Sequence, residues 1–255
     1  MLKDILQNFH KQLDYEPVIE NADKFFNKNK FVVCGMGGSN LAADIIKSWK
    51  PELYVLVHRN YGLPLLNDTE LKNRLVIISS CSGNTEETIS AFEEAFSRSL
   101  DMLIIAAGGK LLELAKEKQV PYIQLPSQKE NPRFIVGLSI KATLKAMGEE
   151  LILESMNGTS FSLNSEMYEM TGKELAQKLK NKIPLIYSSY RNRGLGYFWK
   201  IHFNETVKVS AFCNSWPELN HNEMAGFGYR DVKHEGDNNF TFIFFNDHVD
   251  NPLIK

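Results

Sequence analysis

The residues from Leu75 to Thr88, LVIISSCSGNTEET, combine an apolar run with a turn of small hydroxyl side chains. The run Leu75–Ile78 predicts a buried strand, and Glu86 with Glu87 begins a predicted helix. The free backbone N–H groups of such a helix start, its positive dipole end and the short hydroxyls point toward one spot. The pattern predicts a phosphate-binding turn that carries the hydroxyls of Ser79, Ser80, Ser82 and Thr85. An ordinary helix cap, for which Ser and Thr are preferred residues, explains the same pattern equally well.

A second turn, GMGGSN from Gly35 to Asn40, follows the apolar run Phe31–Cys34 and precedes a predicted helix. This layout is typical of the first unit of a nucleotide-binding or phosphate-binding α/β fold. The dinucleotide fingerprint is incomplete, because the third glycine and the acidic ribose partner are missing, and no Gly-Lys-Ser/Thr of a P-loop occurs. The turn therefore predicts backbone N–H groups around Gly38, with the Ser39 hydroxyl, close to a small ligand.

Strands and helices alternate through the first half of the chain, with further strands expected at Met102–Ala106 and Val120–Leu125. This alternation predicts a doubly wound parallel sheet, with three layers in the order helix, sheet, helix. Ligands in such sheets lie beyond the carboxyl ends of the strands, so the two turns could share one site. Arg133 ends a polar loop after the fifth strand, where it is either a solvated surface arginine or a guanidinium directed at the substrate.

The second half of the chain repeats the α/β pattern after a polar stretch. We expect a first domain at residues 1–150, a linker at 151–170 and a second domain at 171–255. The second domain is expected to be incomplete, because only three strands can be placed before the chain stops. These strands are Pro184–Ser188, Val207–Phe212 and Phe240–Phe245, with helices expected at Gly172–Lys180 and Leu195–Thr206.

The composition of the 255 residues is that of a globular protein, with 43% hydrophobic and 24% charged residues. A net charge of −2 without a basic block disfavours nucleic acid or a membrane surface as partner. No apolar run approaches the roughly 20 residues of a membrane helix, and the N-terminus does not have the pattern of a signal peptide. Three widely spaced cysteines predict reduced thiols and a cytoplasmic location.

Five segments together carry a resemblance to a known family: FVVCGMGGSNLAADI, ISSCSGNTEET, NPR, FNETVKVSAF and PELNHNEMAGF. In this order along the chain they resemble the bifunctional phosphoglucose/phosphomannose isomerases, which are built from two sugar-isomerase (SIS) domains. The serine-rich turn alone marks any SIS domain, including regulators that bind sugar phosphates. The pairing of Asn204-Glu205 with the run from Glu218 to Glu223 is more specific.

The resemblance implies an aldose–ketose isomerase that interconverts glucose 6-phosphate with fructose 6-phosphate, without metal or organic cofactor, and with mannose 6-phosphate as a candidate second substrate. It implies phosphate contacts from Ser80, Ser82 and Thr85, with backbone groups around Gly38 and Ser39. It also implies that Glu205 is the catalytic base, that Arg133 lies beside the enediolate, and that His221 opens the sugar ring. It also implies a homodimer in which His221 reaches the partner subunit's site. The residue types suit this chemistry, since a carboxylate can accept and return a proton and an arginine stays charged beside growing negative charge.

Simpler explanations exist for each of these residues. Glu205 could be a solvated residue near a helix end, and His221 could be a turn histidine. His202 and Glu205 have the spacing of a metal-binding pair, but no second pair completes a site. Cys81, between Ser80 and Ser82, is expected to be a small side chain in a tight turn, with a reactive thiol as the alternative.

The family pattern continues beyond the last residue, Lys255, with a segment that includes a lysine implicated in ring opening. Lys255 is therefore not assigned that role, and the residues that let the family handle both sugar phosphates are expected partly in that segment. A non-catalytic sugar-phosphate-binding SIS module is the alternative function.

Overall fold

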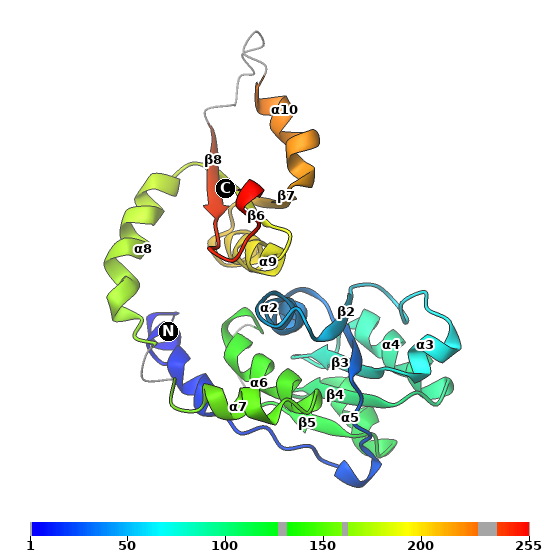
Figure 1. Cartoon of the computed structure of the whole chain (residues 1–255). Helices are drawn as coiled ribbons and strands as arrows, with labels where there is room; N and C mark the ends of the chain where they lie inside the picture. The colour runs from blue at the N-terminus through cyan, green and yellow to red at the C-terminus, as the bar shows by residue number, and fades with distance from the viewer. Residues whose placement is uncertain (1, 127–131, 160–162, 229–238, 255) are drawn as a thin grey trace. The chain divides into compact units, whose positions relative to one another are not determined.

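The computed structural model of the chain describes residues 2–126, 132–159, 163–228 and 239–254. It divides into two compact units, residues 1–167 and 168–255 (Figure 1). Each unit contains a parallel sheet with helices on its faces, so the predicted α/β fold is confirmed. None of the helices in the described ranges is long and apolar enough to cross a membrane.

The first unit is built on a five-stranded sheet in the order β2-β1-β3-β4-β5, with every neighbouring pair parallel. Its strands are β1 (Lys30–Cys34), β2 (Tyr54–His58), β3 (Leu75–Ser80), β4 (Met102–Ala106) and β5 (Tyr122–Gln124). Its helices are α1 (Leu2–Gln7), α2 (Leu41–Trp49), α3 (Asp68–Lys72), α4 (Glu86–Ser97), α5 (Gly109–Glu117), α6 (Val136–Ala146) and α7 (Glu150–Met156). Short 3₁₀ turns are η1 (Phe9–Asp14), η2 (Ala22–Lys24), η3 (Gly37–Asn40) and η4 (Pro132–Ile135).

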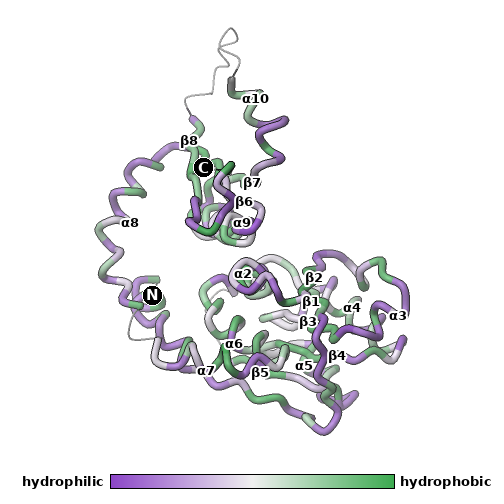
Figure 2. Tube along the Cα trace, viewed as in Figure 1, coloured by the Kyte–Doolittle hydropathy of each residue, from purple (hydrophilic) through white to green (hydrophobic). Residues whose placement is uncertain are grey.

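The central strands of this sheet are buried on both faces, which explains why they are apolar throughout (Figure 2). In β3, Leu75 and Ile77 face a cluster built with α2 and α6. Val76 and Ile78 face a second cluster built with α4 and α5. Because successive residues of a strand point to opposite faces, one short apolar run serves both clusters.

The second unit contains a three-stranded parallel sheet in the order β7-β6-β8. Its elements are α8 (Glu166–Leu179), β6 (Ile183–Ser189), α9 (Arg193–Ile201), the π-helical turn η6 (His202–Val207), β7 (Phe212–Trp216), η7 (Glu218–His221), α10 (Glu223–Gly228), β8 (Phe240–Phe245) and η9 (Pro252–Ile254). The order β7-β6-β8 repeats β2-β1-β3 of the first sheet, as expected for two copies of one α/β plan. α8, of which no residue is buried, is mostly hydrophilic (Figure 2).

Two predicted elements differ from the structure. The strand predicted at Val207–Phe212 is wrong, because Val207 ends η6 and the strand begins only at Phe212. The apolar residues that suggested a strand lie in a turn, where Lys208 is left-handed and the N–H of Ala211 donates to Asn204 Oδ1 at 2.7 Å. The stretch predicted as linker, residues 151–170, holds most of α7 and the first turn of α8.

Lys141 attaches the N-terminal segment to α6. Its side chain is buried, with the residue 2% exposed, and its Nζ donates to the carbonyl of Leu13 at 2.6 Å and to Asn157 Oδ1 at 3.1 Å. Burial lowers the pKa of Lys141 below its usual value. The two acceptors satisfy a polar group that would otherwise be costly to bury.

We therefore expect Lys141→Met to lower the free energy of unfolding by about 1–3 kcal/mol, because the carbonyl of the buried residue Leu13 loses its donor. Urea denaturation followed by circular dichroism measures the change. Lys145→Met is the matched control one turn along α6, since Lys145 pairs with Glu150 in a partly exposed ion pair. Exposed pairs contribute roughly 0–1 kcal/mol, so equal losses in both variants would contradict the assignment.

Candidate active site

The GMGGSN turn is held by a buried asparagine at the carboxyl ends of β1 and β2. Asn40 is fully buried, and its Nδ2 donates to the carbonyl of Gly35 and, at 3.2 Å, to that of His58. A Cβ at Gly35 would lie 2.8 Å from both Asn40 Oδ1 and the Ser79 carbonyl oxygen. Glycine is therefore required here by the close approach of the turn to β3.

The hydroxyl-rich turn after β3 is organised by Ser80. Its Oγ accepts the N–H of Gly83 at 3.1 Å and lies 3.0 Å from Thr85 Oγ1. Thr85 occupies the N-cap of α4, yet its side chain makes no capping bond within the described part of the chain. The hydroxyl that an ordinary cap would use is bonded to Ser80 instead, which weakens the simple helix-cap explanation.

The structure brings the two predicted phosphate-binding turns together. The N–H of Cys81 donates to Ser39 Oγ at 3.2 Å, and Ser79 Oγ donates to the Ser39 carbonyl at 3.1 Å. Gly38 and Ser39 thus lie beside residues 79–85 at the carboxyl ends of the paired strands β1 and β3. Ser82, on the same turn, is exposed to solvent.

Arg133 lies in η4 against the same glycine turn. A Cβ at Gly38 would lie 3.2 Å from the backbone nitrogen of Arg133 and 3.0 Å from Pro132 Cβ. Arg133 itself is only 8% exposed, so it is not the solvated surface arginine that the sequence left open. The first unit therefore gathers Gly38, Ser39, the hydroxyl turn and Arg133 in one place.

Cys81 is not activated by these surroundings. Burial raises the pKa of its thiol, whereas a reactive cysteine needs a lowered pKa. The expectation of a small side chain in a tight turn is therefore the better explanation.

Among the described residues, no group of three or more His, Cys, Asp or Glu side chains could hold a metal ion.

The turn that follows β3 packs backbone to backbone against the turn that follows β4. Gly83 has φ +70, and a Cβ on it would lie 1.8 Å from the Gly108 carbonyl oxygen. The N–H of Leu111 donates to the Gly83 carbonyl at 2.8 Å, and that of Lys110 donates to Asn84 Oδ1 at 3.0 Å. These contacts hold the hydroxyl turn in shape from the side of α5.

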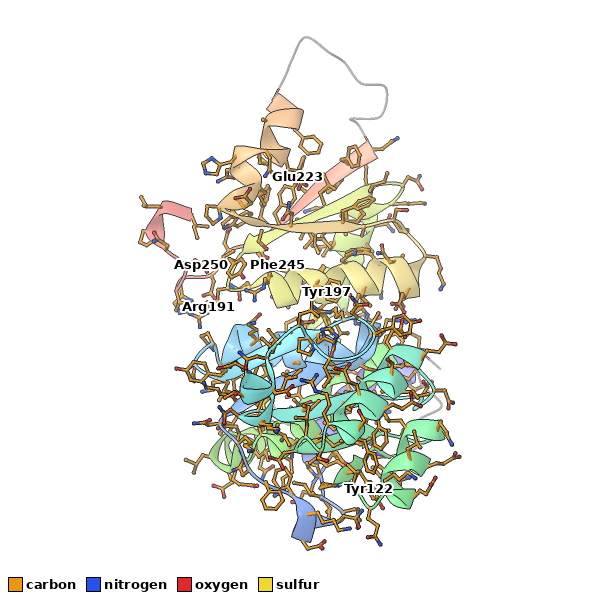
Figure 3. All side chains as sticks on the ribbon, turned by 90° about the vertical axis from the view of Figure 1, so that its right-hand side faces the viewer. Tyr122, Arg191, Tyr197, Glu223, Phe245 and Asp250 are labelled. Carbon is orange, nitrogen blue, oxygen red and sulfur yellow. The ribbon has the colours of Figure 1, made fainter. Side chains whose placement is uncertain are left out.

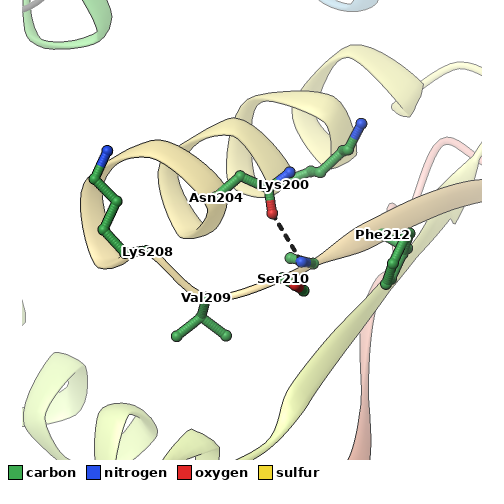
Figure 4. Close-up of a pocket in the computed structure, with 7 residues that line it drawn as sticks. Lys200, Asn204, Lys208, Val209, Ser210 and Phe212 are labelled. Atoms are coloured by element: carbon green, nitrogen blue, oxygen red, sulfur yellow. Dashed lines mark hydrogen bonds between the residues drawn. The ribbon is translucent and has the colours of Figure 1, made fainter.

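Glu205 lies in the second unit, on the π-helical turn η6 that continues α9. Two hydrogen bonds join this turn to the residues before β7. The N–H of Val209 donates to the Phe203 carbonyl at 3.1 Å, and the N–H of Ala211 donates to Asn204 Oδ1 (Figure 4). Asn204 also lines a pocket of about 410 Å³ with Lys200, Lys208, Val209, Ser210, Ala211 and Phe212 (Figure 4). The Glu205 side chain is exposed. Such π-helical turns are frequent at functional sites.

His221 also lies in the second unit, but beyond the other end of β7. β7 ends at Trp216, Pro217 follows, and η7 begins at Glu218. His221 is the last residue of η7 and is exposed. Asn204, the neighbour of Glu205, is bonded to Ala211 just before Phe212, the first residue of β7. A five-residue strand spans about 13 Å between its end Cα atoms, so β7 separates the two side chains within one unit.

Three polar residues of these turns were given no role by the sequence: Asn40, Asn204 and Glu223. Asn204 and Glu223 stand inside the motifs that carried the resemblance, beside Glu205 and His221, so the motifs contained a signal for them. Asn40 ends the GMGGSN turn, and its burial could not be read from its type, because asparagine is usually exposed.

The fold and the paired turns define a sugar-isomerase (SIS) type of α/β protein, and three comparisons agree. A family profile described as "Bacterial phospho-glucose isomerase C-terminal SIS domain" matches residues 169–255. The structure of glucosamine-6-phosphate deaminase from Thermotoga maritima superposes with a TM-score of 0.62 at 19% identity, covering 95% of this chain and 75% of that one. This last likeness shows the fold alone.

Two curated relatives carry the same name. The bifunctional phosphoglucose/phosphomannose isomerase of Aquifex aeolicus is 30% identical over 258 residues, covering 98% of this chain and 76% of that protein. The protein of that name from Caldicellulosiruptor bescii is 33% identical over 215 residues, covering 78% of this chain and 62% of that protein. The chain belongs to the bifunctional phosphoglucose/phosphomannose isomerase family.

We expect Gly83→Ala to lower the free energy of unfolding by about 3 kcal/mol or more, because left-handed strain adds to a clash with the Gly108 carbonyl. Gly158→Ala is the matched control, since Gly158 has φ +82 and no heavy atom of the described residues lies within 4 Å of the place that a Cβ would occupy. The control should cost only about 1–2 kcal/mol. Urea denaturation of both variants measures the difference, and similar losses would exclude the interlocked turns as its cause.

Proposed function

We propose that this protein is an aldose–ketose isomerase that interconverts glucose 6-phosphate, and mannose 6-phosphate as a second substrate, with fructose 6-phosphate. The observation that carries this proposal is the hydrogen bond between the GMGGSN turn and the hydroxyl turn, with Arg133 beside them. The match to the Aquifex aeolicus relative covers 98% of this chain. The enzyme would act in carbohydrate metabolism in the cytoplasm. Its three free cysteines are compatible with a reducing compartment.

The phosphate of the sugar would bind at the start of α4. Backbone N–H groups there carry the positive end of the helix dipole, and the Thr85 side chain does not cap them within the described residues. Ser39, Ser80, Ser82 and Thr85 supply short hydroxyls around the same point. The phosphate would hold the sugar by its far end and leave C1 and C2 for the reaction.

Glu205 would carry out the proton transfer. As a carboxylate it removes the proton from C2 of the open-chain aldose, which gives a cis-enediol, and it returns that proton to C1 to form the ketose. A second proton moves from the C2 hydroxyl to the C1 oxygen, so the reaction is balanced without a redox partner. The permanent charge of Arg133 would stabilise negative charge on the two oxygens.

His221 would open the closed sugar ring by moving a proton from the C1 hydroxyl to the ring oxygen, for which a histidine is suited near neutral pH. The positions of Glu205 and His221 beyond opposite ends of β7 support a further part of the proposal. Each site of a homodimer would combine Glu205 of one subunit with His221 of the other. Such a two-fold arrangement is the commonest form of oligomer.

We expect Glu205→Gln to lower kcat for fructose 6-phosphate by about 100- to 10,000-fold, because the amide cannot accept the proton. Binding of fructose 6-phosphate should change little, since the phosphate contacts lie in the first unit. A coupled assay measures turnover, and titration calorimetry measures the dissociation constant.

Glu174→Gln is the matched control for this change, because Glu174 is an exposed carboxylate on α8 of the same unit. Full turnover by Glu205→Gln would contradict the assigned base. Binding without any turnover by the wild-type chain would instead identify a non-catalytic sugar-phosphate-binding module.

Mixing the two impaired variants Glu205→Gln and His221→Ala tests the shared site. If each site combines residues of two subunits, a mixed dimer contains one site with both substitutions and one intact site. Equimolar mixing with full exchange of subunits should then restore roughly a quarter of wild-type activity. If both residues served the same subunit's site, every site would carry one substitution, and mixing would restore nothing.

A further inference from the structure

The segment that carries His221 packs on one face of the second sheet. β6 pairs with β7 so that Tyr187 lies opposite Asn214, and these two side chains share a face. α9 covers the other face, where a Cβ on Gly196 would lie 3.3 Å from Ser188 Oγ. Glu223, at the start of α10, lies on the side of the strands opposite α9 (Figure 3).

Apolar contacts hold this segment at both ends. Near its start, Leu219 is 1% exposed and packs in a cluster with Leu185, Tyr187 and Trp216. At its end, the ring of Phe227 makes edge-to-face contacts with Phe240 and Phe242, at centroid distances of 5.9 and 5.2 Å. His221 and Glu223 lie between these two contacts.

Glu223 forms the polar attachment between the two apolar ones. Its Oε1 accepts the hydroxyl of Tyr187 at 2.6 Å, and its Oε2 accepts Asn214 Nδ2 at 2.5 Å. Burial, and then the carboxylate of Glu223, raise the pKa of Tyr187, so its hydroxyl keeps the proton that it donates. Each carboxylate oxygen thus has a donor from a different strand, which fixes both the position and the rotation of Glu223.

The segment cannot hold its own shape by helix formation. η7 and α10 contain four and six residues, and isolated helices of that length are unstable in water. His221 is exposed and stands two residues before Glu223. The position of its backbone therefore depends on the neighbouring attachments to the sheet.

We propose that Glu223, held by Tyr187 and Asn214, is a positioning residue that fixes His221 for ring opening. The inference rests on the proposed function, since it assumes that His221 acts on the sugar. Glu223 does not itself touch the substrate in this scheme. Its carboxylate is occupied by the sheet, and its effect on the reaction passes through His221.

A double-mutant cycle with Glu223→Gln and His221→Ala tests this coupling. The glutamine keeps the size of the side chain but replaces one acceptor with a donor that faces Asn214. We expect Glu223→Gln to lower kcat for glucose 6-phosphate by about 10- to 100-fold when His221 is present. In the His221→Ala background the same change should have no further effect, and Glu174→Gln should have none in either background.

A purely structural role gives a different result. Equal losses of kcat in both backgrounds would overturn the proposal, because Glu223 would then act independently of His221. Unchanged kcat in the His221 background would overturn it as well. If Glu223→Gln does not fold, Tyr187→Phe removes the other hydrogen bond of the Glu223 carboxylate while keeping the aromatic ring, and it takes the place of Glu223→Gln in the cycle.

A measurement that does not depend on turnover separates this inference from the proposed function. In the chain labelled at histidine Cε1, the NMR signal missing from His221→Ala identifies His221. In Tyr187→Phe and Glu223→Gln this signal should sharpen and shift, because the histidine becomes mobile. An unchanged signal overturns the positioning role, whereas absence of isomerase activity in the wild-type chain overturns only the proposed function.

Discussion

The parallel pairing of β1 with β3 is the constraint on which the candidate site depends. Parallel neighbours end at the same edge of the sheet, so the pairing sets the GMGGSN turn beside the hydroxyl turn. Ser39 then reaches the N–H of Cys81, and Gly38 lies against the backbone of Arg133. β3 is buried on both faces, so the strand that forms the centre of the core also places the hydroxyl turn at this edge of the sheet.

The hydroxyls of this site combine two tasks. Ser80 bonds to Gly83 and Thr85, and Ser39 bonds to Cys81, so the turns are organised before any ligand arrives. Thr85 is thereby kept from capping α4 within the described residues, and the helix start remains suited to an anion. Preorganisation of this kind reduces the loss of conformational entropy on binding.

In the second unit the same α/β plan separates residues instead of gathering them. A helix that returns to the start of the next strand leaves Glu205 before β7, while His221 follows β7. The two therefore lie beyond opposite ends of one strand, an arrangement well suited to sites shared between subunits. The Asn204 bond to Ala211 and the Glu223 bonds to β6 and β7 stabilise these two positions.

The sequence by itself determined the α/β class and most elements, because apolar periodicity and turn residues are local signals. The resemblance to the family came from five motifs and their order along the chain. It also located the hydroxyl turn and the glycine turn, since both follow apolar strands. Only the tertiary structure decided that Arg133 is buried, that β7 begins at Phe212 and that Tyr187 holds Glu223. Each of these depends on side chains far apart in the chain or on hydrogen bonds that compete with strand pairing, which local patterns do not encode.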